Sequence, residues 1–146
     1  MTGTTMNDIS GITNKAFPHN NTGNARYWHT NSFAGAGGLK SNLRDLIKYT
    51  RAQLSTDSST ALSRAILLSQ QATAQLNGKD VFGLGWGYYY TPANKRVLMK
   101  DGGTGGFTSF IVLDKSAQKA VVALFNNNED NDPATPLANF IHSYFN

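Results

Sequence analysis

The chain has 146 residues, of which 40% are hydrophobic and 15% charged, a balance that excludes a disordered chain and a membrane-spanning one. Its 13 basic residues outnumber 9 acidic ones and give a net charge of +4, but they are spread along the sequence, so we predict no nucleic-acid partner. Because the chain has no cysteine, disulfides, thiolate catalysis and cysteine-bound zinc are excluded, and an oxidising compartment is compatible with the composition.

The first 40 residues are predicted to form a loop region. Residues 1–32 are rich in Thr, Asn and Gly without a hydrophobic period, which is typical of a loop laid over neighbouring elements. His19 and His29 lack the spacing to carboxylates that a metal site needs, so we interpret them as loop residues and predict no metal. Asn20 begins the glycosylation pattern Asn-x-Thr, which three residues alone do not establish.

Two helices are predicted within residues 41–76. The first begins at Ser41 or Asn42, because Asp45 stands in the capping-box position three residues after Asn42. The second is expected from about Ala61 to Ala74. The positions expected to face the core are Leu43, Leu46, Ile47 and Leu54 in the first helix, and Leu62, Ala65, Ile66 and Ala72 in the second.

From Phe82 to Tyr90 the hydrophobic period changes from helical to alternating, which predicts a strand. Large side chains occupy the even positions, and glycines occupy three of the odd ones. One face should therefore be an aromatic wall that packs on the core, whereas the other is bare backbone, approached by a neighbouring segment or by a ligand. The wall consists of Phe82, Leu84, Trp86, Tyr88 and Tyr90.

Three further strands are predicted at residues 96–100, 107–114 and 119–126. The last two are apolar at consecutive positions, which indicates that helices cover both faces of the sheet. A final helix should begin at Asp132, with Pro133 at its first position. These elements predict an α+β fold, in which a long N-terminal loop and two helices precede an antiparallel sheet of about four strands with a C-terminal helix on one face. The inward positions expected in that helix are Leu137, Phe140, Ile141 and Tyr144.

The stretch from Lys100 to Phe107, Lys-Asp-Gly-Gly-Thr-Gly-Gly-Phe, joins two of these strands. Clustered glycines destabilise a strand, so their presence needs a structural or functional reason. One interpretation is a hairpin turn whose glycines adopt positive φ. The other is a strand edge where a ligand lies against bare backbone and N–H groups bind an oxyanion.

This stretch resembles the third signature of the penicillin-recognising serine hydrolases, which include class C β-lactamases, D-alanyl-D-alanine carboxypeptidases, other penicillin-binding proteins and related esterases. In that family a Lys-Thr-Gly (or His-x-Gly) triplet on an active-site strand often continues into Thr-Gly-Gly-Phe. Residues 82–86 (Phe-Gly-Leu-Gly-Trp) and 34–41 (Ala-Gly-Ala-Gly-Gly-Leu-Lys-Ser) are similar to the class C branch as well. The resemblance extends from about Phe33 to Asn128 and rests on the order and spacing of these motifs.

The resemblance also implies which parts of the family pattern the chain lacks. Members use a serine nucleophile with a lysine three residues later, and then a Tyr-x-Asn or Ser-x-Asn motif, neither of which occurs here at a suitable position. Both precede the Ala-Gly-Gly-Leu helix in the family, so we predict that residues 1–146 are a single C-terminal fragment of a larger hydrolase. Within it, residues 1–40 would be loop, 41–76 helical, and 80–146 the sheet and last helix.

Roles for the glycine-rich stretch follow from the resemblance. Lys100 matches the family's strand lysine, a cation beside the nucleophile, and is predicted to be catalytic. Gly103 matches the residue whose N–H forms half of the oxyanion hole. Gly102 ends the triplet and Thr104 would border the pocket, so both are predicted to contact substrate.

Asp101 departs from the family pattern, which has a hydroxyl there that binds a substrate carboxylate. A second carboxylate would repel that group, or it would point away and pair with Lys100. Either arrangement opposes β-lactam recognition but leaves serine-ester chemistry open. Asn126 or Asn127 matches an asparagine that class C enzymes place near the same substrate carboxylate, although both asparagines also suit a strand-end turn.

We therefore expect the C-terminal part of a bacterial-type serine hydrolase that forms an acyl-enzyme with a β-lactam, a D-Ala-D-Ala peptide of peptidoglycan or an ester. The fragment alone is expected to be inactive, to need no cofactor, and to belong in the periplasm or outside the cell. The alternative is a non-enzymatic module that binds a peptide or a glycan between the aromatic wall and the glycine-rich strand. An uncovered sheet edge also predicts either a homo-oligomer or a complex with the N-terminal half of the hydrolase.

Overall fold

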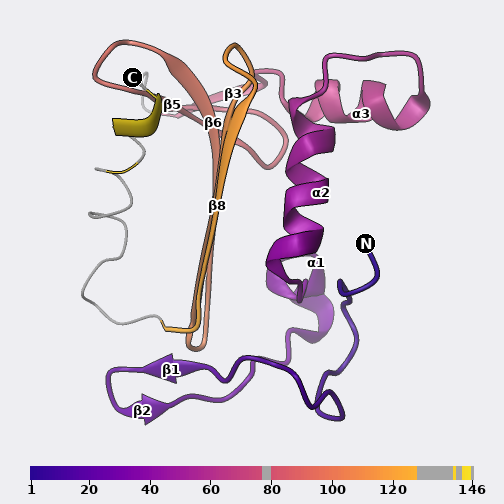
Figure 1. The fold of residues 1–146 in the computed structure, drawn as a ribbon, viewed down its shortest axis with the longest axis vertical. Coiled ribbons are helices and arrows are strands. Elements are labelled where there is room, and N and C mark those ends of the chain that lie inside the picture. Colours follow the sequence, from indigo (N-terminus) through magenta and orange to yellow (C-terminus); the bar gives the residue numbers. More distant parts are fainter. Residues whose placement is uncertain (77–79, 128–139, 141–142, 146) are drawn as a thin grey trace.

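The computed structural model describes residues 1–76, 80–127, 140 and 143–145. Its main element is a six-stranded antiparallel sheet in the order β3-β4-β5-β6-β7-β8, so strands that are adjacent in sequence are also adjacent in the sheet. Helix α2 lies along one face of the sheet, and the C-terminal helical residues lie on the other (Figure 1). The predicted α+β class is therefore confirmed, as is the prediction that helices cover both faces.

The elements form in two groups along the chain. The first group contains β1 (His19–Asn20), β2 (Gly23–Asn24), the 3-10 helix η1 (Asn31–Phe33), α1 (Ala34–Gly37), α2 (Leu43–Leu54) and α3 (Ala61–Ser69). The second contains β3 (Ala74–Leu76), β4 (Asp80–Phe82), β5 (Gly87–Tyr90), β6 (Arg96–Thr104), β7 (Phe107–Asp114) and β8 (Lys119–Phe125). The sheet thus has more strands than the four predicted.

The additional strands arise where the sequence predicted the end of a helix. Helix α3 stops at Ser69 rather than near Ala74, because the amide of Leu84 donates to the Ser69 carbonyl at 2.8 Å and the Thr73 amide to the Phe82 carbonyl at 2.8 Å. These long-range hydrogen bonds satisfy groups that a longer helix would have used. The residues that follow pair with β4 instead of continuing the helix.

The strand predicted from residue 82 to 90 is interrupted. Strand β4 ends at Phe82 and β5 begins at Gly87, with Gly85 between them at φ 86°. Gly83 lies so close to the end of α3 that a Cβ there would stand 2.6 Å from the Ser69 carbonyl oxygen. The close approach predicted for the bare backbone is therefore made by a neighbouring segment of the chain.

The predicted aromatic wall does not form a single face. Trp86 is buried with 4% exposure, whereas Leu84 is 59% exposed and Tyr90 50%. The bend at Gly85 breaks the two-residue alternation that the wall required, because a residue with positive φ cannot continue a flat strand. That prediction was wrong, and the peptide or glycan groove built on the wall loses its basis.

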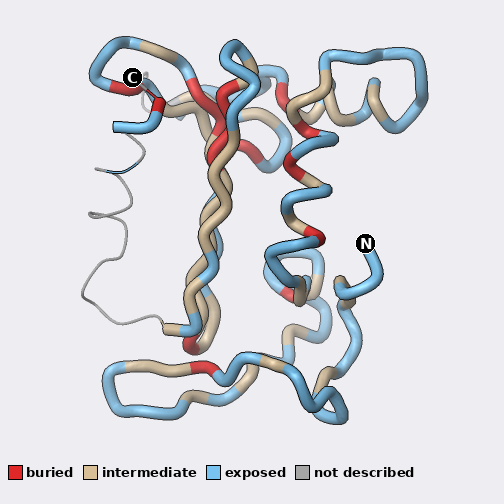
Figure 2. The backbone as a smooth tube through the Cα atoms, viewed as in Figure 1, coloured by how far each residue is buried: buried red, intermediate tan, exposed pale blue. Residues whose placement is uncertain are grey.

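The core consists of two apolar clusters, one on each face of the sheet. On one face Val97 and Val112 pack around Phe145. On the other face Leu98 and Leu113 pack with Trp86 and, from α2, with the partly buried residues Tyr49 and Leu54. Adjacent strand residues belong to different clusters because side chains alternate between faces. The buried residues gather at the end of the sheet opposite the β1–β2 hairpin (Figure 2).

The described part of the C-terminal helix differs from its prediction. Phe140 and Tyr144 are 50% and 41% exposed and stack on each other with ring centroids 5.6 Å apart, whereas Phe145 is buried. The inward side chain is thus Phe145, which fills the cluster around Val97 and Val112. The other predicted residues of this helix lie outside the described part of the chain, namely Asp132, Pro133, Leu137 and Ile141.

Helix α2 begins as predicted but buries different residues. Asn42 caps it, since its Oδ1 accepts from the Asp45 amide at 3.0 Å. Of the predicted inward residues, Leu46 and Leu54 are half-buried, while Leu43 and Ile47 are 49% and 41% exposed. The side chains that the helix buries fully are polar, namely Asp45, Thr50 and Gln53.

Candidate active site

The glycine-rich stretch divides between a strand and a turn. Strand β6 does not end at Lys100, as predicted, but continues to Thr104, so Gly102 and Gly103 lie within it. Only Gly105 and Gly106 form the turn to β7, with Gly106 at φ 100°. The hairpin-turn interpretation therefore holds for Gly105 and Gly106, whereas the ligand-binding interpretation remains a prediction for Gly102 and Gly103, which lie within the strand.

One edge of β6 is open along the site. Strand β5 pairs with β6 from Arg96 only as far as Met99, where its partner is Gly87. On the other edge, β7 stays paired as far as Thr104. Within the part of the chain that the structure describes, no strand pairs with the outer edge of residues 100–103. This edge can accept a ligand along bare backbone.

The register determines which backbone groups face the open edge. Thr104 and Phe107 flank the two-residue turn and stand opposite each other. In such a hairpin the flanking pair exchanges backbone hydrogen bonds, and the pairs behind it alternate between bonded and non-bonded. By this alternation, the backbone N–H and C=O groups of Gly102 form hydrogen bonds with β7. The same groups of Gly103 and Asp101 face the open edge. Gly103 thus has the orientation that an oxyanion donor needs.

Lys100 and Asp101 form an exposed ion pair. The Lys100 Nζ lies 3.4 Å from Asp101 Oδ1 and donates to the Asp101 carbonyl at 2.6 Å. Their side chains are 55% and 65% exposed, so water and salt weaken this pair. Of the two arrangements considered for Asp101, the structure has the one in which the carboxylate pairs with the lysine.

Lys100 and Thr104 lie on the face of the sheet that carries α2. Alternate strand residues share a face, and Leu98 belongs to the cluster that packs against α2. Thr104 reaches α1, where a Cβ on Gly37 would stand 3.9 Å from its Cγ2. Helix α1, which lies within the Ala-Gly-Ala-Gly-Gly motif, therefore borders the site strand.

An aromatic loop holds the tip of the β6–β7 hairpin. Trp28 lies directly against Gly105, where an added Cβ would stand 2.1 Å from the indole Nε1. One residue earlier, Tyr27 stacks on Phe107 of β7 with ring centroids 5.9 Å apart. The N-terminal segment thus lies over neighbouring elements, as predicted, but it is not loop throughout, because it contains β1, β2, η1 and α1. Its role at the site was not predicted, although the aromatic pair was the one dense feature of an otherwise polar segment.

A second part of the same loop closes over Gly106. The His19 amide donates to the Gly106 carbonyl at 3.2 Å. A Cβ added to Gly106 would stand 2.6 Å from the Cβ of buried Pro18. A side chain at residue 105 or 106 would push the loop away, so these glycines are required for close approach as much as for turn geometry.

Asn126 stands apart from the other predicted site residues. It follows β8, two strands from β6, and its Nδ2 donates to the Phe17 carbonyl at 3.3 Å. His19 Nδ1 lies 3.1 Å from the Asn126 carbonyl oxygen, and Thr108 Oγ1 donates to the Asn127 carbonyl at 2.9 Å. The structure brings residues 100–104 together on one strand, and it uses both asparagines to attach the N-terminal loop and the end of the sheet.

A recess of about 360 Å³ opens beside the hairpin tip, between the N-terminal loop and α1. Trp28 lines it together with Asp8 and Lys40. Hydrogen bonds from Ser10 hold the pKa of Asp8 below its ordinary value. Among the described residues, no three histidine or acidic side chains are grouped to hold a metal, and no helix is long and apolar enough to cross a membrane.

The fold is similar to the folds of solved proteins. A beta-lactamase/D-alanine carboxypeptidase from Pseudomonas syringae has a similar structure, with a TM-score of 0.80 and 22% identity over 99% of this chain and 49% of its own. A class C beta-lactamase gives a TM-score of 0.79 at 18% identity, over 98% of this chain and 47% of its own. The chain thus spans about half the length of the solved chains that it matches.

A search of curated proteins gave no match. The family model named Beta-lactamase, however, matches residues 6–144, which is nearly the whole sequence. The chain therefore belongs to the beta-lactamase family.

Proposed function

We propose that this chain supplies the oxyanion strand of a serine hydrolase that works through an acyl-enzyme. Its substrate is an amide or ester carbonyl, as in a β-lactam, a D-alanyl-D-alanine peptide or a simple ester. The open edge of β6 carries the proposal, because by the register the Gly103 N–H faces that edge, beside a lysine. Membership of the beta-lactamase family and the fold of the matched structures support the reaction class.

In this reaction a serine oxygen attacks the carbonyl, whose oxygen becomes negative until the leaving group departs. The Gly103 N–H donates to that oxygen, and it needs no reorganisation because β6 is held by β7 on its other edge. The Lys100 ammonium stabilises negative charge at the site and lowers neighbouring pKa values. Water then attacks the acyl-enzyme, and the same donor stabilises the second tetrahedral intermediate.

The Asp101 carboxylate favours substrates without a carboxylate of their own. It lies on the site strand next to Lys100 and takes up part of the lysine's charge. A β-lactam or D-alanyl peptide brings a carboxylate, which here meets a lysine that is already paired with Asp101, whereas a neutral ester has no such group. As part of the same proposal, the hydrolase acts in the periplasm or outside the cell, where peptidoglycan peptides are found.

The nucleophile is proposed to lie on a separate half of the hydrolase, because the Ser-x-x-Lys motif does not occur at a suitable position here. The test is covalent labelling of the isolated chain with a fluorescent penicillin and a fluorophosphonate, followed by intact mass spectrometry. We expect no adduct on the isolated chain and one adduct, on the partner polypeptide, when a nucleophile-bearing half is added. Stoichiometric labelling of a serine within residues 1–146 would overturn this division of roles.

A further inference from the structure

The β1–β2 hairpin carries a motif that the proposed function does not use. Asn20, Asn21 and Thr22 form the glycosylation pattern Asn-x-Thr, and no other asparagine of the chain has a serine or threonine two residues later. A glycan is bulky and hydrophilic, so an acceptor asparagine has to lie at the surface. Whether this pattern can serve as an acceptor therefore depends on the geometry of the hairpin.

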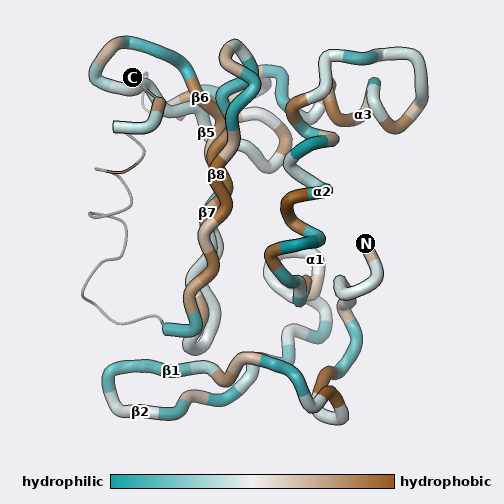
Figure 3. Tube along the Cα trace, viewed as in Figure 1, coloured by the Kyte–Doolittle hydropathy of each residue, from teal (hydrophilic) through white to brown (hydrophobic). Residues whose placement is uncertain are grey.

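The pattern stands at the exposed turn of the hairpin. Asn20 ends β1 opposite Gly23 of β2, so Asn21 and Thr22 are the two turn residues. Residues 21–24 are exposed, and Asn20 is half-buried. Figure 3 shows that the hairpin is hydrophilic, and Figure 2 that it lies opposite the end of the sheet where most buried residues gather. A large polar group attached here displaces no part of the core.

The acceptor side chain is held by its own motif. Asn20 Oδ1 accepts hydrogen bonds from the Thr22 amide at 3.0 Å and from the Thr22 hydroxyl at 2.8 Å. Both bonds go to the oxygen of the side-chain amide, so its nitrogen, Nδ2, is the atom that can take a sugar. Because the bonds join residues two apart, this arrangement is local and forms independently of the rest of the fold.

A polar recess adjoins the acceptor. Its volume is about 540 Å³, within the range typical of ligand pockets. Asparagine amides carry both donors and acceptors, which pair with the hydroxyl and acetamido groups of a sugar. Such amides dominate the lining of the recess, which consists of His19, Asn20, Asn21, Gly23, Asn126 and Asn127.

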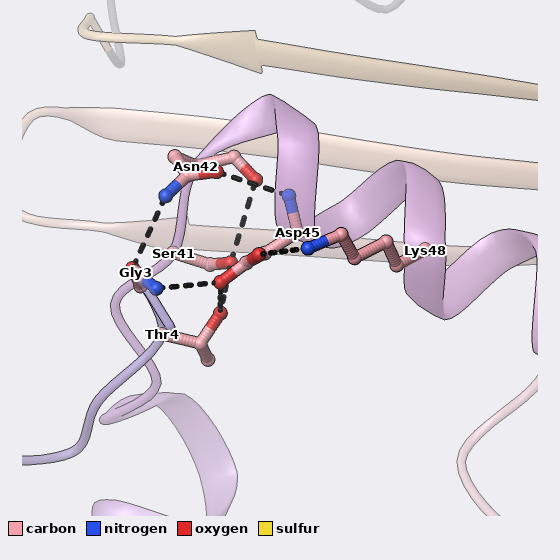
Figure 4. A network of polar contacts seen from close by, with 6 residues as sticks. All are labelled: Gly3, Thr4, Ser41, Asn42, Asp45 and Lys48. Atoms are coloured by element: carbon pink, nitrogen blue, oxygen red, sulfur yellow. Dashed lines mark hydrogen bonds and ion pairs between the residues drawn. The ribbon is translucent and has the colours of Figure 1, made fainter. Parts of the chain in front are cut away.

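The segment that carries the hairpin is attached to the folded body on both sides of its loop. At the hairpin, the His19 amide donates to the Asn126 carbonyl at 3.1 Å, which joins two walls of the recess. Near the start of the chain, the Gly3 amide and Thr4 Oγ1 donate to Asp45 Oδ2 at 2.8 and 2.9 Å (Figure 4). The acceptor is thus held in a fixed position beside the recess.

We propose that Asn20 is an acceptor for an N-linked oligosaccharide whose first sugar lies in this recess. The donor is an oligosaccharide carried on a lipid pyrophosphate, and a separate transferase catalyses the step. Asn20 Nδ2 forms a bond to the anomeric carbon of the first sugar, while the bond from that carbon to the phosphate oxygen breaks. The lipid pyrophosphate leaves with the electron pair of that bond, and one Nδ2 proton passes to a base of the transferase.

This inference rests on the location outside the cytoplasm that is part of the proposed function, because N-linked glycans are attached to secreted chains. It does not depend on the hydrolytic reaction, since no residue of the site strand takes part. An added signal peptide supplies the location in the test below, and the readout is the mass of the chain. Glycosylation and hydrolysis can therefore each fail without the other.

The test translates the full chain, fused to a cleavable signal peptide, with microsomes that contain the transferase and its lipid-linked donor. Protease added outside the microsomes leaves only translocated molecules, and mass spectrometry measures the attached mass and its position. We expect one oligosaccharide, on Asn20, that an N-glycosidase removes. Asn20→Gln and Thr22→Val should abolish it, because they remove the acceptor and the hydroxyl. Thr22→Ser and Asn21→Gln keep both groups and should retain it.

A second acceptor in the same chain provides the positive control. In the Asn20→Gln chain, Ser58→Asn makes residues 58–60 read Asn-Ser-Thr in the exposed loop before α3. The microsomes used are those that glycosylate this control chain. With them, a translocated parent chain at its unmodified mass would overturn the proposal, and so would a glycan that Thr22→Val leaves in place.

The position of the first sugar is tested by hydrogen exchange of the glycosylated chain and of the Asn20→Gln chain. The amides of Gly23 and Asn127 should exchange more slowly when the glycan is present, because both residues line the recess. Residues 116–118, in the turn at the other end of β7 and β8, should exchange equally in both chains. Equal exchange at Gly23 and Asn127 would show that the sugar does not occupy the recess.

Discussion

At residue 103 a backbone role can be separated from a side-chain role. A Cβ added to Gly103 meets no atom within 4 Å, so alanine fits there and keeps the N–H that points to the open edge. Proline removes that N–H without disturbing the β7 pairing. In the complete enzyme, Gly103→Pro should lower kcat by about 10²–10³-fold, and Gly103→Ala should leave it within a small factor. Equal kinetics for both variants would show that this N–H is not an oxyanion donor.

The negative charge of Asp101 leads to a prediction about substrate preference. Replacing it by threonine removes the ion pair with Lys100 and restores the hydroxyl found in the family. We expect Asp101→Thr to raise kcat/KM for a β-lactam by about 10-fold, because Lys100 is released from its ion pair and a hydrogen-bond donor stands at residue 101. A neutral ester should show little change and serves as the control substrate. An equal effect on both substrates would mean that Asp101 acts on the reaction rather than on the substrate carboxylate.

Among single elements, the end of α2 depends on a residue of the β7–β8 turn. The Lys115 Nζ donates to the carbonyls of Gln53 and Ser55 at 3.1 and 2.9 Å and to Gln70 Oε1 at 2.7 Å. A cation at this position donates hydrogen bonds to the last carbonyls of the helix and interacts favourably with the negative end of the helix dipole. Burial lowers the pKa of Lys115, but these acceptors favour its charged form.

Lys115→Met keeps the length of the side chain and removes these hydrogen bonds. It should lower the free energy of unfolding by about 1–3 kcal/mol, measured by urea denaturation. Lys48→Met is the control, because the Lys48 ammonium is 54% exposed and 3.7 Å from its partner on α2. The control should cost less than about 0.5 kcal/mol. Similar losses for both variants would show that Lys115 does not cap the helix.

The end of β7 is connected to the C-terminal helix through a buried carboxylate. Asp114 Oδ2 lies 2.7 Å from the Lys95 Nζ, which also donates to the Phe145 carbonyl at 3.3 Å. Burial alone raises the pKa of Asp114, but hydrogen bonds from Lys95, Ser116 and Ala117 outweigh it and hold this pKa below its ordinary value of 3.8.

A lowered pKa in the folded state means that the unfolded chain binds more protons as the solution is acidified. Asp114 therefore contributes stability above its unfolded pKa, and that contribution is lost as the pH falls from about 4 through the folded pKa. In thermal melts between pH 7 and 2, Asp114→Asn should lower the melting temperature most at neutral pH and flatten its acid dependence. The exposed Asp57→Asn variant should leave the neutral-pH melting temperature nearly unchanged.

An element could be predicted from the sequence when the interactions that form it lie within its own segment. Helix α2 and strands β7 and β8 were predicted to within about a residue, because their capping residues and apolar periods lie within the segments themselves. The β3–β4 hairpin and the bend at Gly85 were missed, since both depend on hydrogen bonds to the end of α3. The site strand was found through the spacing of its motif, whereas the loop around Trp28 has no motif and became visible only through its contact with Gly105.

The whole molecule has its core at one end and along the middle strands. Buried residues lie on β6 and β7, while β8 and the α2 residues Leu43 and Ile47 remain partly or largely exposed (Figure 2). Local stability follows burial, so different parts of the chain should open with different free energies. Hydrogen exchange of the isolated chain measures these differences at single amides.

The register makes the expected exchange pattern specific. Within β8, the amides of Val121 and Ala123 bond to β7, whereas those of Ala120, Val122 and Leu124 point to the free edge. The second set should exchange rapidly in the isolated chain, and the amides of β7 should exchange slowest. When the nucleophile-bearing half of the proposed hydrolase is added, the outward amides of β8 should become protected, because free strand edges pair with other chains. If Ala120, Val122 and Leu124 were as protected as β7 in the isolated chain, at a single chain's mass in light scattering, the 146 residues would close their own core without a partner.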